Sequence, residues 1–382
     1  MADWQSSLEN LGISIMFSNH YRGKKVLITG HTGFKGSWLT AWLLKLEAIV
    51  CGISDQIPTS PSMFESLALE QKIEHHFCDI RDFNGVSKIL TNFKPDYVFH
   101  LAAQPIVSSS YEDPLNTIST NVMGTAILLE ALKQWNQPCN VVFITSDKCY
   151  ENVEWMWGYK ETDHLGGRDI YSGSKGAAEV IFHAYYHSFF THQNNKIRMA
   201  TGRAGNVIGG GDWAKDRIVV DCIKSWAEGN VVEIRSPNAT RPWQHVLEPL
   251  SGYLTLGARL NSDRQLLGES FNFGPRSEQN RTVLDLLIDL SEHWSFGKSD
   301  VPYRVTADIP FHEASLLKLN CDKSLFLLKW EANLSYKECV QMVGEWYFSF
   351  YKTKKNMYQC TQDQITRYEN LAMEKNLIWN QV

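Results

Sequence analysis

The stretch KVLITGHTGFKGSWLTAW (25–42) places three glycines between an apolar run and a helical pattern. The run before the glycines has the continuous apolar character of a strand that is buried on both faces. Gly30, Gly33 and Gly36 follow at the spacing G-x-x-G-x-x-G. Glycines in a strand-to-helix turn let the backbone approach a pyrophosphate at the N-terminus of the helix. The stretch therefore predicts a dinucleotide-binding turn at the start of a sheet.

Apolar runs alternate with helical patterns up to about residue 219. Strands are expected at 25–30, 48–54, 75–80, 97–103, 141–146 and 198–209, with a helix at 37–47. Buried strands that are separated by helices indicate an α/β protein with a doubly wound parallel Rossmann sheet. Beyond residue 211 the pattern loosens, and 231–236, 270–275 and the helical 282–294 predict a second, smaller mixed α/β substrate domain.

The expected division of the chain has three parts. A Rossmann domain covers 21–205 and also takes part of 240–275, and a substrate domain covers 206–350 and is interleaved with it. Residues 351–382 are expected to form a helical tail. We find no internal repeat and no low-complexity linker.

Composition excludes several classes of function. The 382 residues are 43% hydrophobic and 21% charged, with a net charge of −5, which does not suit a nucleic-acid binder. No apolar run approaches the roughly 20 residues that cross a bilayer, and the N-terminal stretch has no basic region typical of a signal peptide. The eight cysteines form no CxxC pair and no zinc-type spacing, so we expect no metal and a reducing, cytoplasmic compartment.

A second strand ends abruptly in polar residues. In VVFITSDKCYENVEWMWGYKE (141–161), the apolar run stops at Ser146, Asp147 and Lys148. The carboxyl ends of parallel strands open into the ligand crevice of such sheets. The three side chains are therefore predicted to line that crevice.

Tyr171 and Lys175 stand four residues apart in a predicted helix, on one face of it. A phenol with a reference pKa near 10 is a poor base at neutral pH, and a nearby ammonium is expected to lower that pKa. Lys175 is also suited to bind nicotinamide ribose hydroxyls. The YxxxK pattern alone often arises by chance. Combined with the glycine turn and Ser146, it predicts a site in which Tyr171 deprotonates a hydroxyl that Ser146 binds.

These motifs together resemble the extended short-chain dehydrogenase/reductase superfamily over about 23–351, and within it most closely the family of CDP-glucose 4,6-dehydratases. The resemblance is carried by TGHTGFKGSWL, HLAAQP, TNVMGT, ITSDKCYEN, YSGSKG, RAGNVIGGGDWAKDRIV, RPWQHVLEPLSGYL and HEASLLKLNCDKS. It implies a lyase that makes a 4-keto-6-deoxy sugar nucleotide for deoxysugar or polysaccharide biosynthesis. It also implies a homodimer, or a dimer of dimers, formed through helices at about 114–135 and 172–187.

The resemblance also implies residue roles. NAD, rather than NADP, would contact Gly30, Gly33, Phe34, Gly36, Asp79, Ile80, Leu101, Ala102, Ala103, Thr120, Tyr171 and Lys175. The nucleotide sugar would contact Gln104, Ser146, Asn206, Arg217 and Arg241. Catalysis would involve Ser146, Asp147, Lys148, Tyr171 and Lys175. Both arginines also fit surface ion pairs, and Trp213, Trp243 and His245 fit either a nucleotide pocket or the core.

Dehydration needs a group that protonates the departing C6 hydroxyl and a base for the C5 proton. Asp147 suits the acid and Lys148 the base. Thymidine-linked relatives have Thr-Asp-Glu at this strand end, whereas Ser146-Asp147-Lys148 matches the CDP-linked group. A structural Asp147–Lys148 ion pair is the alternative.

Other functions remain open at this point. An epimerase, a decarboxylase, or a dehydratase specific for dTDP-, UDP- or GDP-sugars would need the same serine, tyrosine and lysine. A non-catalytic NAD-binding regulator would need none of them. The choice of CDP as the nucleotide rests on the resemblance alone.

Overall fold

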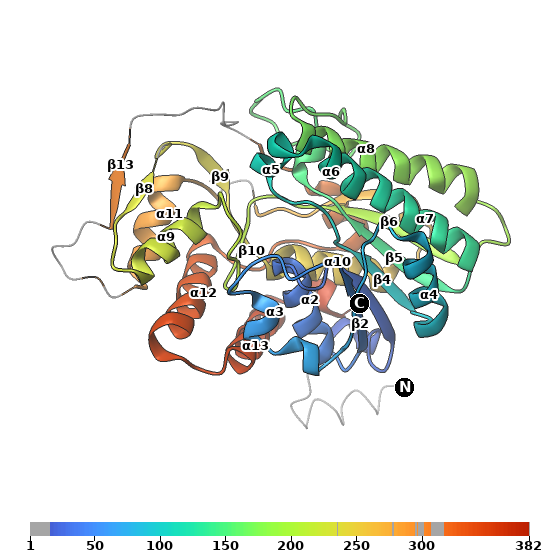
Figure 1. The fold of residues 1–382 in the computed structure, drawn as a ribbon, viewed down its shortest axis with the longest axis horizontal. Coiled ribbons are helices and arrows are strands. Elements are labelled where there is room, and N and C mark those ends of the chain that lie inside the picture. Colours follow the sequence, from blue (N-terminus) through green and yellow to red (C-terminus); the bar gives the residue numbers. More distant parts are fainter. Residues whose placement is uncertain are drawn as a thin grey trace.

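A seven-stranded parallel sheet forms the centre of the larger lobe (Figure 1). The computed structural model describes residues 16–234, 236–276, 279–294, 296, 302–306 and 317–381. The strand order is β11-β6-β5-β4-β1-β2-β3. The strands are β1 (Lys25–Thr29), β2 (Ile49–Ser54), β3 (Glu74–Phe77), β4 (Tyr97–His100), β5 (Cys139–Ile144), β6 (Ile197–Arg203) and β11 (Ser270–Asn272). The predicted parallel, doubly wound sheet is confirmed, and its order reverses between β1 and β4, where such sheets bind ligands.

Helices cover both faces of this sheet, because successive side chains of each strand point to opposite faces. Val26 and Ile28 of β1 join one apolar core, and Leu27 joins the other. The first core includes residues of α2 (Phe34–Lys45), α10 (Leu247–Arg259) and α13 (Met357–Glu374). The second includes residues of α4 (Phe83–Phe93), α7 (Gly124–Trp135) and α8 (Ile170–Tyr185). The strands therefore read as continuous apolar runs.

Shorter helical segments complete the larger lobe and its connections. The α-helical segments are α3 (Met63–Ser66), α5 (Val107–Glu112) and α6 (Pro114–Ile118). Tight 3-10 turns occur at η1 (Met16–Asn19), η2 (Leu69–Gln71), η4 (Asp147–Cys149), η6 (Arg264–Leu266) and η9 (Ile378–Gln381). Wider π turns occur at η3 (Ser119–Met123), η5 (Tyr186–Phe190), η7 (Ser324–Leu328) and η8 (Ser349–Thr353). Since α6, η3 and α7 follow one another directly, they span the helix expected at 114–135.

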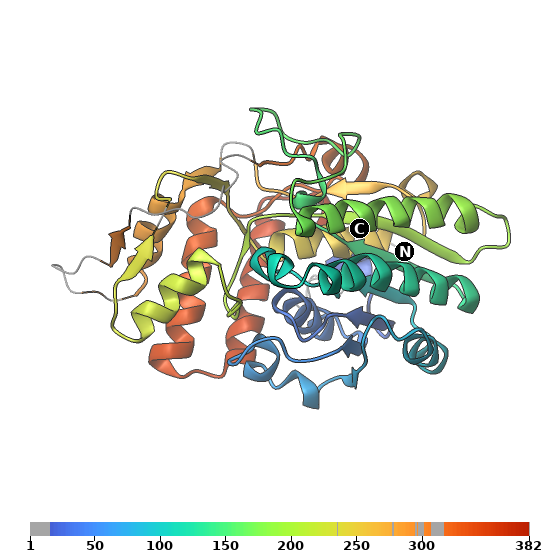
Figure 2. The ribbon, with the colours of Figure 1, turned by 45° about the horizontal axis from the view of Figure 1, so that its top comes forward.

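The smaller lobe is built from helices and short strand pairs, and Figure 2 shows it beside the sheet. Its helices are α9 (Ile218–Ala227), α11 (Val283–Ser291) and α12 (Tyr336–Phe348). Two strand pairs belong to it: β8 (Val232–Ile234) with β13 (Tyr303–Val305), and β9 (Thr240–Pro242) with β12 (Asn280–Thr282). A third pair, β7 (Val207–Ile208) with β10 (Gln244–His245), lies where the chain passes between the lobes.

One prediction about the smaller lobe was wrong. The residue pattern placed 270–275 there, whereas the domain division gave part of 240–275 to the Rossmann domain, and β11 does pair with β6 and extend the central sheet. Phe271 and Asn272 are fully buried in that position. Apolar character marks a short strand as buried, but it does not say which of two cores the strand joins.

The C-terminal tail is helical, as expected, and it packs into the core. Glu369 of α13 accepts a hydrogen bond from Trp42 Nε1 at 2.9 Å and pairs with Lys45 at 3.0 Å, and both partners lie on α2. The Tyr368 hydroxyl donates to buried Glu248 of α10 at 2.8 Å. The tail therefore contacts both α2 and α10, two helices on the same face of the sheet. Within the described residues, no helix has the length and apolar character of a transmembrane span.

The Tyr368–Glu248 contact predicts a pH-dependent loss of stability in Tyr368→Phe. Burial raises the pKa of Glu248 from 4.5 to about 7, so this group's contribution to stability falls as pH rises from about 4.5 through 7. The Tyr368 hydroxyl favours the ionised carboxylate, so its removal should cost about 1.5–3 kcal/mol of unfolding free energy at pH 8 and less at pH 6. Urea unfolding at both pH values measures this. Tyr358→Phe on the same helix is the control, and equal losses for Tyr368→Phe at both pH values would contradict the expectation.

Candidate active site

In the glycine turn, the backbone at Gly30 packs directly against the backbone of Leu101 and Ala102. Gly30 has a φ of +76°, and a Cβ there would lie 2.7 Å from the Ala102 nitrogen that follows β4. A Cβ on Gly36 would lie 2.2 Å from the Gly30 carbonyl oxygen. Helix α2 begins immediately after Gly33. The turn is thus a cradle that side chains would fill, at a helix N-terminus, and this combination fits a pyrophosphate.

The other residues expected to contact NAD lie along the same edge of the sheet. Asp79 and Ile80 follow β3, Leu101–Ala103 follow β4, and Thr120 lies in η3. The Asp79 carboxylate pairs with Arg81 at 2.6 Å, and hydrogen bonds from Arg81 lower the Asp79 pKa. Ile80 is buried under Gly124, where a Cβ would approach its Cγ2 to 2.7 Å. The groups follow the path that an extended dinucleotide would take across β1–β4.

The strand-end residues and the face of α8 meet at the crevice. The Ser146 hydroxyl donates to Asp147 at 2.9 Å and accepts from the Lys148 amide at 3.2 Å, and Ser146 lies near enough to Tyr171 to influence its pKa. Lys175 Nζ lies 5.8 Å from the centre of the Tyr171 ring. Asp147 is only 5% exposed. The structure thus brings together four of the five residues expected to act in catalysis, and Lys148 is the next residue in the same turn.

The prediction that Lys175 lowers the pKa of Tyr171 was wrong for the protein without a ligand. Burial, and then the Asp147 carboxylate, raise the pKa of Tyr171 to about 12, although the neighbouring Ser146 hydroxyl opposes them. Burial and the neighbouring Lys35 lower the pKa of Lys175 to about 8, so the ammonium is itself disfavoured. Sequence spacing shows that Tyr171 and Lys175 are close, but it does not show that a carboxylate faces the phenol. A further positive charge in the crevice would favour the phenolate.

Two cations on opposite walls face this centre. Arg217 precedes α9 and donates to Asp212 at 2.5 Å, and its charge acts on both Tyr171 and Lys35. Burial and Arg217 lower the pKa of Lys35 to about 8, whereas Asp147 and Asp212 oppose that shift. Lys35 was not expected at the site, because the glycine turn indicated only backbone contacts to a ligand. A lysine within such a turn is the signal that would have identified it.

The remaining residues expected to bind the sugar nucleotide are more dispersed. Asn206 joins β6 to β7 with a φ of +52°. The Gln104 amide is already engaged: it donates to Thr117 at 2.8 Å and accepts from the Ile106 amide. Arg241 lies in β9 and donates to the Thr240 carbonyl at 2.9 Å. Arg217 acts electrostatically on Tyr171, whereas the contact of Arg241 with the Thr240 carbonyl does not involve Tyr171.

The three aromatic residues with two possible roles are buried. Trp213 donates to the Tyr351 hydroxyl at 3.0 Å and packs against Trp346, with ring centres 5.7 Å apart. His245 is fully buried against Trp38, and Trp243 is 6% exposed. For Trp213 and His245, these contacts favour a role in the core.

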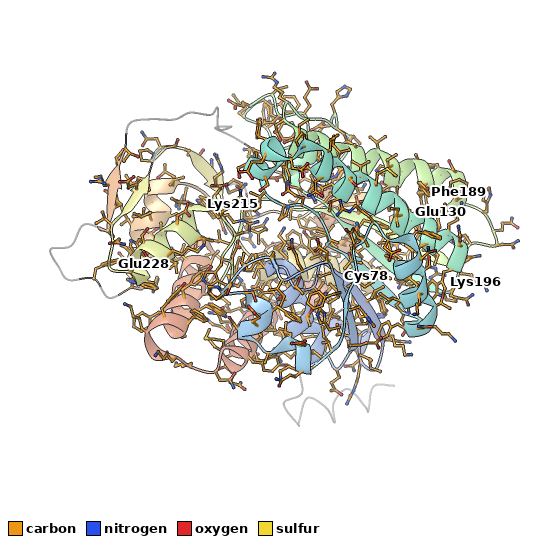
Figure 3. The ribbon with its side chains drawn as sticks, viewed as in Figure 1. Cys78, Glu130, Phe189, Lys196, Lys215 and Glu228 are labelled. Carbon is orange, nitrogen blue, oxygen red and sulfur yellow. The ribbon has the colours of Figure 1, made fainter. Side chains whose placement is uncertain are left out.

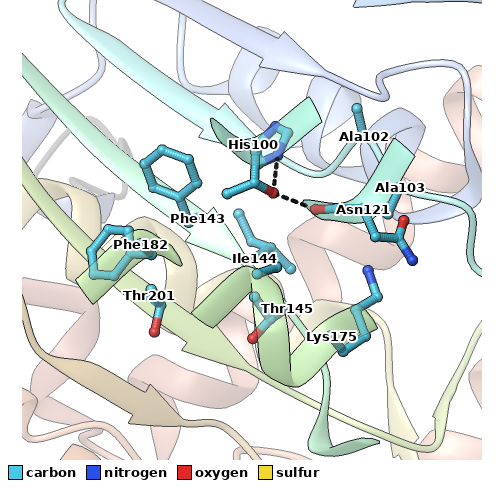
Figure 4. Close-up of a pocket in the computed structure, with 12 residues that line it drawn as sticks. His100, Ala102, Ala103, Asn121, Phe143, Ile144, Thr145, Lys175, Phe182 and Thr201 are labelled. Atoms are coloured by element: carbon cyan, nitrogen blue, oxygen red, sulfur yellow. Dashed lines mark hydrogen bonds between the residues drawn. The ribbon is translucent and has the colours of Figure 1, made fainter. Parts of the chain in front are cut away.

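A cavity lies beside Lys175, between β4, β5 and the helices above them (Figure 4). Lys175 extends from α8 toward Asn121, which donates to Ser174 at 2.9 Å and whose backbone carbonyl accepts from Thr125. Thr125 in turn contacts His100 at 3.3 Å. Burial lowers the pKa of His100 to about 3, so its ring is neutral. Asn121 was missed although it lies in the quoted motif TNVMGT.

Polar contacts also connect the lobes at the edge of the crevice. The Ser108 hydroxyl donates to Asp216 at 2.5 Å, and Lys215 pairs with Glu112 at 3.2 Å. Figure 3 places Lys215 on the side of the smaller lobe that faces α5. The loop that carries Arg217 is therefore anchored to the larger lobe.

One cluster of metal-binding side chains occurs in the described part of the chain, away from this crevice. Donor atoms of Cys51, Glu74 and His76 lie within 4.8 Å of one another on β2 and β3. Glu74 and His76 already contact each other at 2.8 Å. This contact uses two of the three donors, and we assign no metal to the cluster.

The model of the family described as GDP-mannose 4,6 dehydratase matches residues 27–343. The chain belongs to this family. Among curated proteins, a CDP-glucose 4,6-dehydratase of Salmonella typhimurium (strain LT2) is 44% identical over 353 residues, covering 92% of this chain and 97% of the relative. A CDP-paratose 2-epimerase of Salmonella typhi is 26% identical over 84% of this chain and 98% of the relative. The family lies within the extended short-chain dehydrogenases/reductases, as the motifs predicted.

Solved structures agree on the fold. The epimerase Mth375 of Methanothermobacter thermautotrophicus has a TM-score of 0.73 at 21% identity, covering 88% of this chain and 96% of that one. DesIV, a dTDP-glucose 4,6-dehydratase of Streptomyces venezuelae solved with NAD and TYD bound, has a TM-score of 0.72 at 20% identity, covering 87% and 100%. Both likenesses support a Rossmann-type sheet with a second lobe.

The geometry predicts a specific defect in Tyr171→Phe. The variant keeps the aromatic ring but removes the phenol hydroxyl that is proposed to take the proton. Loss of a general base typically costs 10²–10⁴-fold, so kcat should fall by about that factor while KM changes little. Steady-state kinetics on the accepted nucleotide sugar measure both constants. Activity within a few-fold of the wild type would show that Tyr171 is not the base.

Proposed function

We propose that this protein is a CDP-glucose 4,6-dehydratase, a lyase that converts CDP-glucose to CDP-4-keto-6-deoxyglucose and water. The observation that carries the proposal is the 44% identity to such an enzyme over nearly the full length of both chains. The Ser146-Asp147-Lys148 strand end and the Tyr171/Lys175 pair supply groups for the chemistry. The product is a starting point for deoxysugar and polysaccharide synthesis, which we place in the cytoplasm because all eight cysteines are free thiols.

NAD would lie across the carboxyl edge of β1–β4, with its pyrophosphate on the bare backbone of Gly30, Gly33 and Gly36. Bound NAD would supply redox chemistry without net consumption, since hydride taken from C4 would be given back at C6 in each turnover. Lys175 is placed to hold nicotinamide ribose hydroxyls from below the Tyr171 ring. We propose that residues 21–205, with part of 240–275, form this cofactor domain.

Proton handling falls to the crevice side chains. Tyr171 takes the C4 hydroxyl proton while Ser146 hydrogen-bonds the same hydroxyl. The resulting ketone acidifies C5–H, Lys148 removes that proton, and Asp147 protonates the departing C6 hydroxyl, which leaves as water. Lys148 returns its proton to C5 when hydride is delivered to C6, and proton exchange with solvent restores Tyr171 and Asp147. Among the salt bridges between described residues, none joins Asp147 to Lys148, which argues against a purely structural pair.

The sugar nucleotide would lie between the lobes, with residues 206–350 as its domain. Arg217 is placed best for an anionic group, because Asp212 fixes its guanidinium and its charge reaches Tyr171. We retain Asn206, Arg241 and Gln104 as proposed contacts, although the Gln104 amide must exchange its protein partners to reach a ligand.

The protein is further proposed to form a homodimer, or a dimer of dimers, through α6–η3–α7 and α8. Large apolar side chains are exposed along these helices: Leu115 is 77% exposed, Met123 52% and Val180 54%. Figure 3 places Phe189, at the end of this helix pair, close to Glu130 of α7. An isologous contact would bury this apolar row. A monomeric mass in dilute solution would contradict the assignment.

Incubation with a panel of nucleotide hexoses tests the function. CDP-glucose should lose one water, detected by mass, with NAD needed only in catalytic amounts and no steady accumulation of NADH. dTDP-, UDP- and GDP-linked hexoses serve as competing substrates. Preference for one of these would assign another dehydratase of the same superfamily. NADH formed in step with product would indicate a simple dehydrogenase.

Lys148→Met separates the two half-reactions. Oxidation at C4 depends on Tyr171 and should survive, whereas elimination should not. The variant should therefore hold reduced cofactor, visible by absorbance, together with a 4-keto-hexose. It should also fail to exchange C5–H with deuterated solvent. Exchange at near the wild-type rate would show that another group removes the C5 proton.

A further inference from the structure

A buried ion pair lies directly behind the catalytic turn. Arg203, at the end of β6, donates to both carboxylate oxygens of Glu179 at 3.0 Å, and the two side chains are 1% and 0% exposed. Burial opposes the charge of Glu179, but Arg203 lowers the Glu179 pKa to about 2, so the carboxylate is ionised. Neither residue belongs to the mechanism described above.

The pair holds both ends of the turn 146–149. Thr145, before the turn, donates its hydroxyl to Glu179 at 2.5 Å. Tyr150, after the turn, accepts a hydrogen bond from Arg203 at 2.7 Å and donates to Asn272 at 2.8 Å. Glu179 also lies on α8, one helical turn beyond Lys175 and two beyond Tyr171. One ion pair thus links the strand-end groups to the helix that carries the other catalytic groups.

Stability alone does not explain such a pair. Removing two charges from water costs free energy that their attraction only partly returns, and apolar residues of similar size often serve stability as well. The ion pair fixes an orientation. The bidentate arginine sets the plane of the Glu179 carboxylate, so the carboxylate oxygens accept hydrogen bonds at fixed positions. Thr201 and Ser270 fill the remaining positions at 3.1 Å each.

We propose that Glu179 and Arg203 are positioning residues, whose ion pair sets the place of Ser146, Asp147 and Lys148 relative to Tyr171 through Thr145 and Tyr150. Only the chemical roles of Ser146, Asp147 and Lys148 are taken from the proposed function; the effect of the ion pair on their positions is independent of it. Misplacement of reacting groups by about 1 Å can cost on the order of 10²-fold in rate. A loosened turn would therefore lower turnover more than substrate binding.

Thr145→Val tests the proposal without breaking the ion pair. The substitution conserves shape and removes the one hydroxyl that ties the strand end to Glu179. Ser270→Ala is the matched control, because it removes a donor to the same carboxylate from β11, on the far side of β6. Thr145→Ser restores the hydroxyl, and Tyr150→Phe removes the contact at the other end of the turn.

Two measurements are made on each variant. Thr145→Val and Tyr150→Phe should lower kcat about 10–100-fold, with KM for the accepted nucleotide sugar within about twofold of the wild type. Thr145→Ser and Ser270→Ala should stay near wild type. Hydrogen–deuterium exchange, followed by mass spectrometry on the protein without substrate, should speed up in peptides covering the amides of Lys148, Cys149 and Tyr150 only in the first two variants.

The exchange measurement needs no turnover, so it separates this proposal from the proposed function. A wild-type protein that leaves CDP-glucose unchanged would overturn the proposed function. Hydrogen exchange in the turn would still test the positioning role of Glu179 and Arg203. Unchanged exchange in Thr145→Val would overturn the positioning role. Equal losses of kcat in Thr145→Val and Ser270→Ala would also overturn it, because the ion pair would then be a general support of the core.

Discussion

The close approach of the glycine turn to the end of β4 is the constraint on which the rest of the site depends. The backbone at Gly30 passes so near Ala102 that a Cβ would fall 2.7 Å from its nitrogen. This contact lies between β1 and β4, where the strand order reverses and helices leave toward opposite faces. The crevice therefore opens at this point. Polar residues that follow the strands, among them Asp79 and Ser146, border this crevice.

Charge in this crevice is arranged around a phenol that keeps its proton. Burial and Asp147 raise the pKa of Tyr171 to about 12, and burial lowers the pKa values of Lys35 and Lys175 to about 8. A positively charged ligand group beside Tyr171 would reverse part of this balance, because it favours the phenolate and opposes the effect of Asp147. In the proposed reaction, Tyr171 would therefore become an effective base only beside such a group.

Local patterns in the sequence were sufficient for the sheet, the glycine turn and the Ser146, Tyr171 and Lys175 set, because each depends on short-range periodicity or spacing. They failed where two distant segments meet. The lobe that β11 joins depends on its pairing with β6, and the pKa of Tyr171 depends on a carboxylate 24 positions away in the chain. Glu179 was within reach, since it follows Tyr171 and Lys175 at the same four-residue spacing. Its partner Arg203 comes from another strand, and only the fold brings the two together.

The segments outside the family motifs still bear on the cofactor site through α2. Gln362 of α13 donates to the Ala41 carbonyl at 2.9 Å, and Glu369 holds Trp42 and Lys45. These contacts fix the C-terminal half of the helix whose N-terminus forms the proposed pyrophosphate cradle. A helix is stiff along its axis, so restraint at one end limits tilt at the other. The tail therefore restrains the C-terminal half of α2, as Glu179 and Arg203 are proposed to restrain the catalytic turn from behind it.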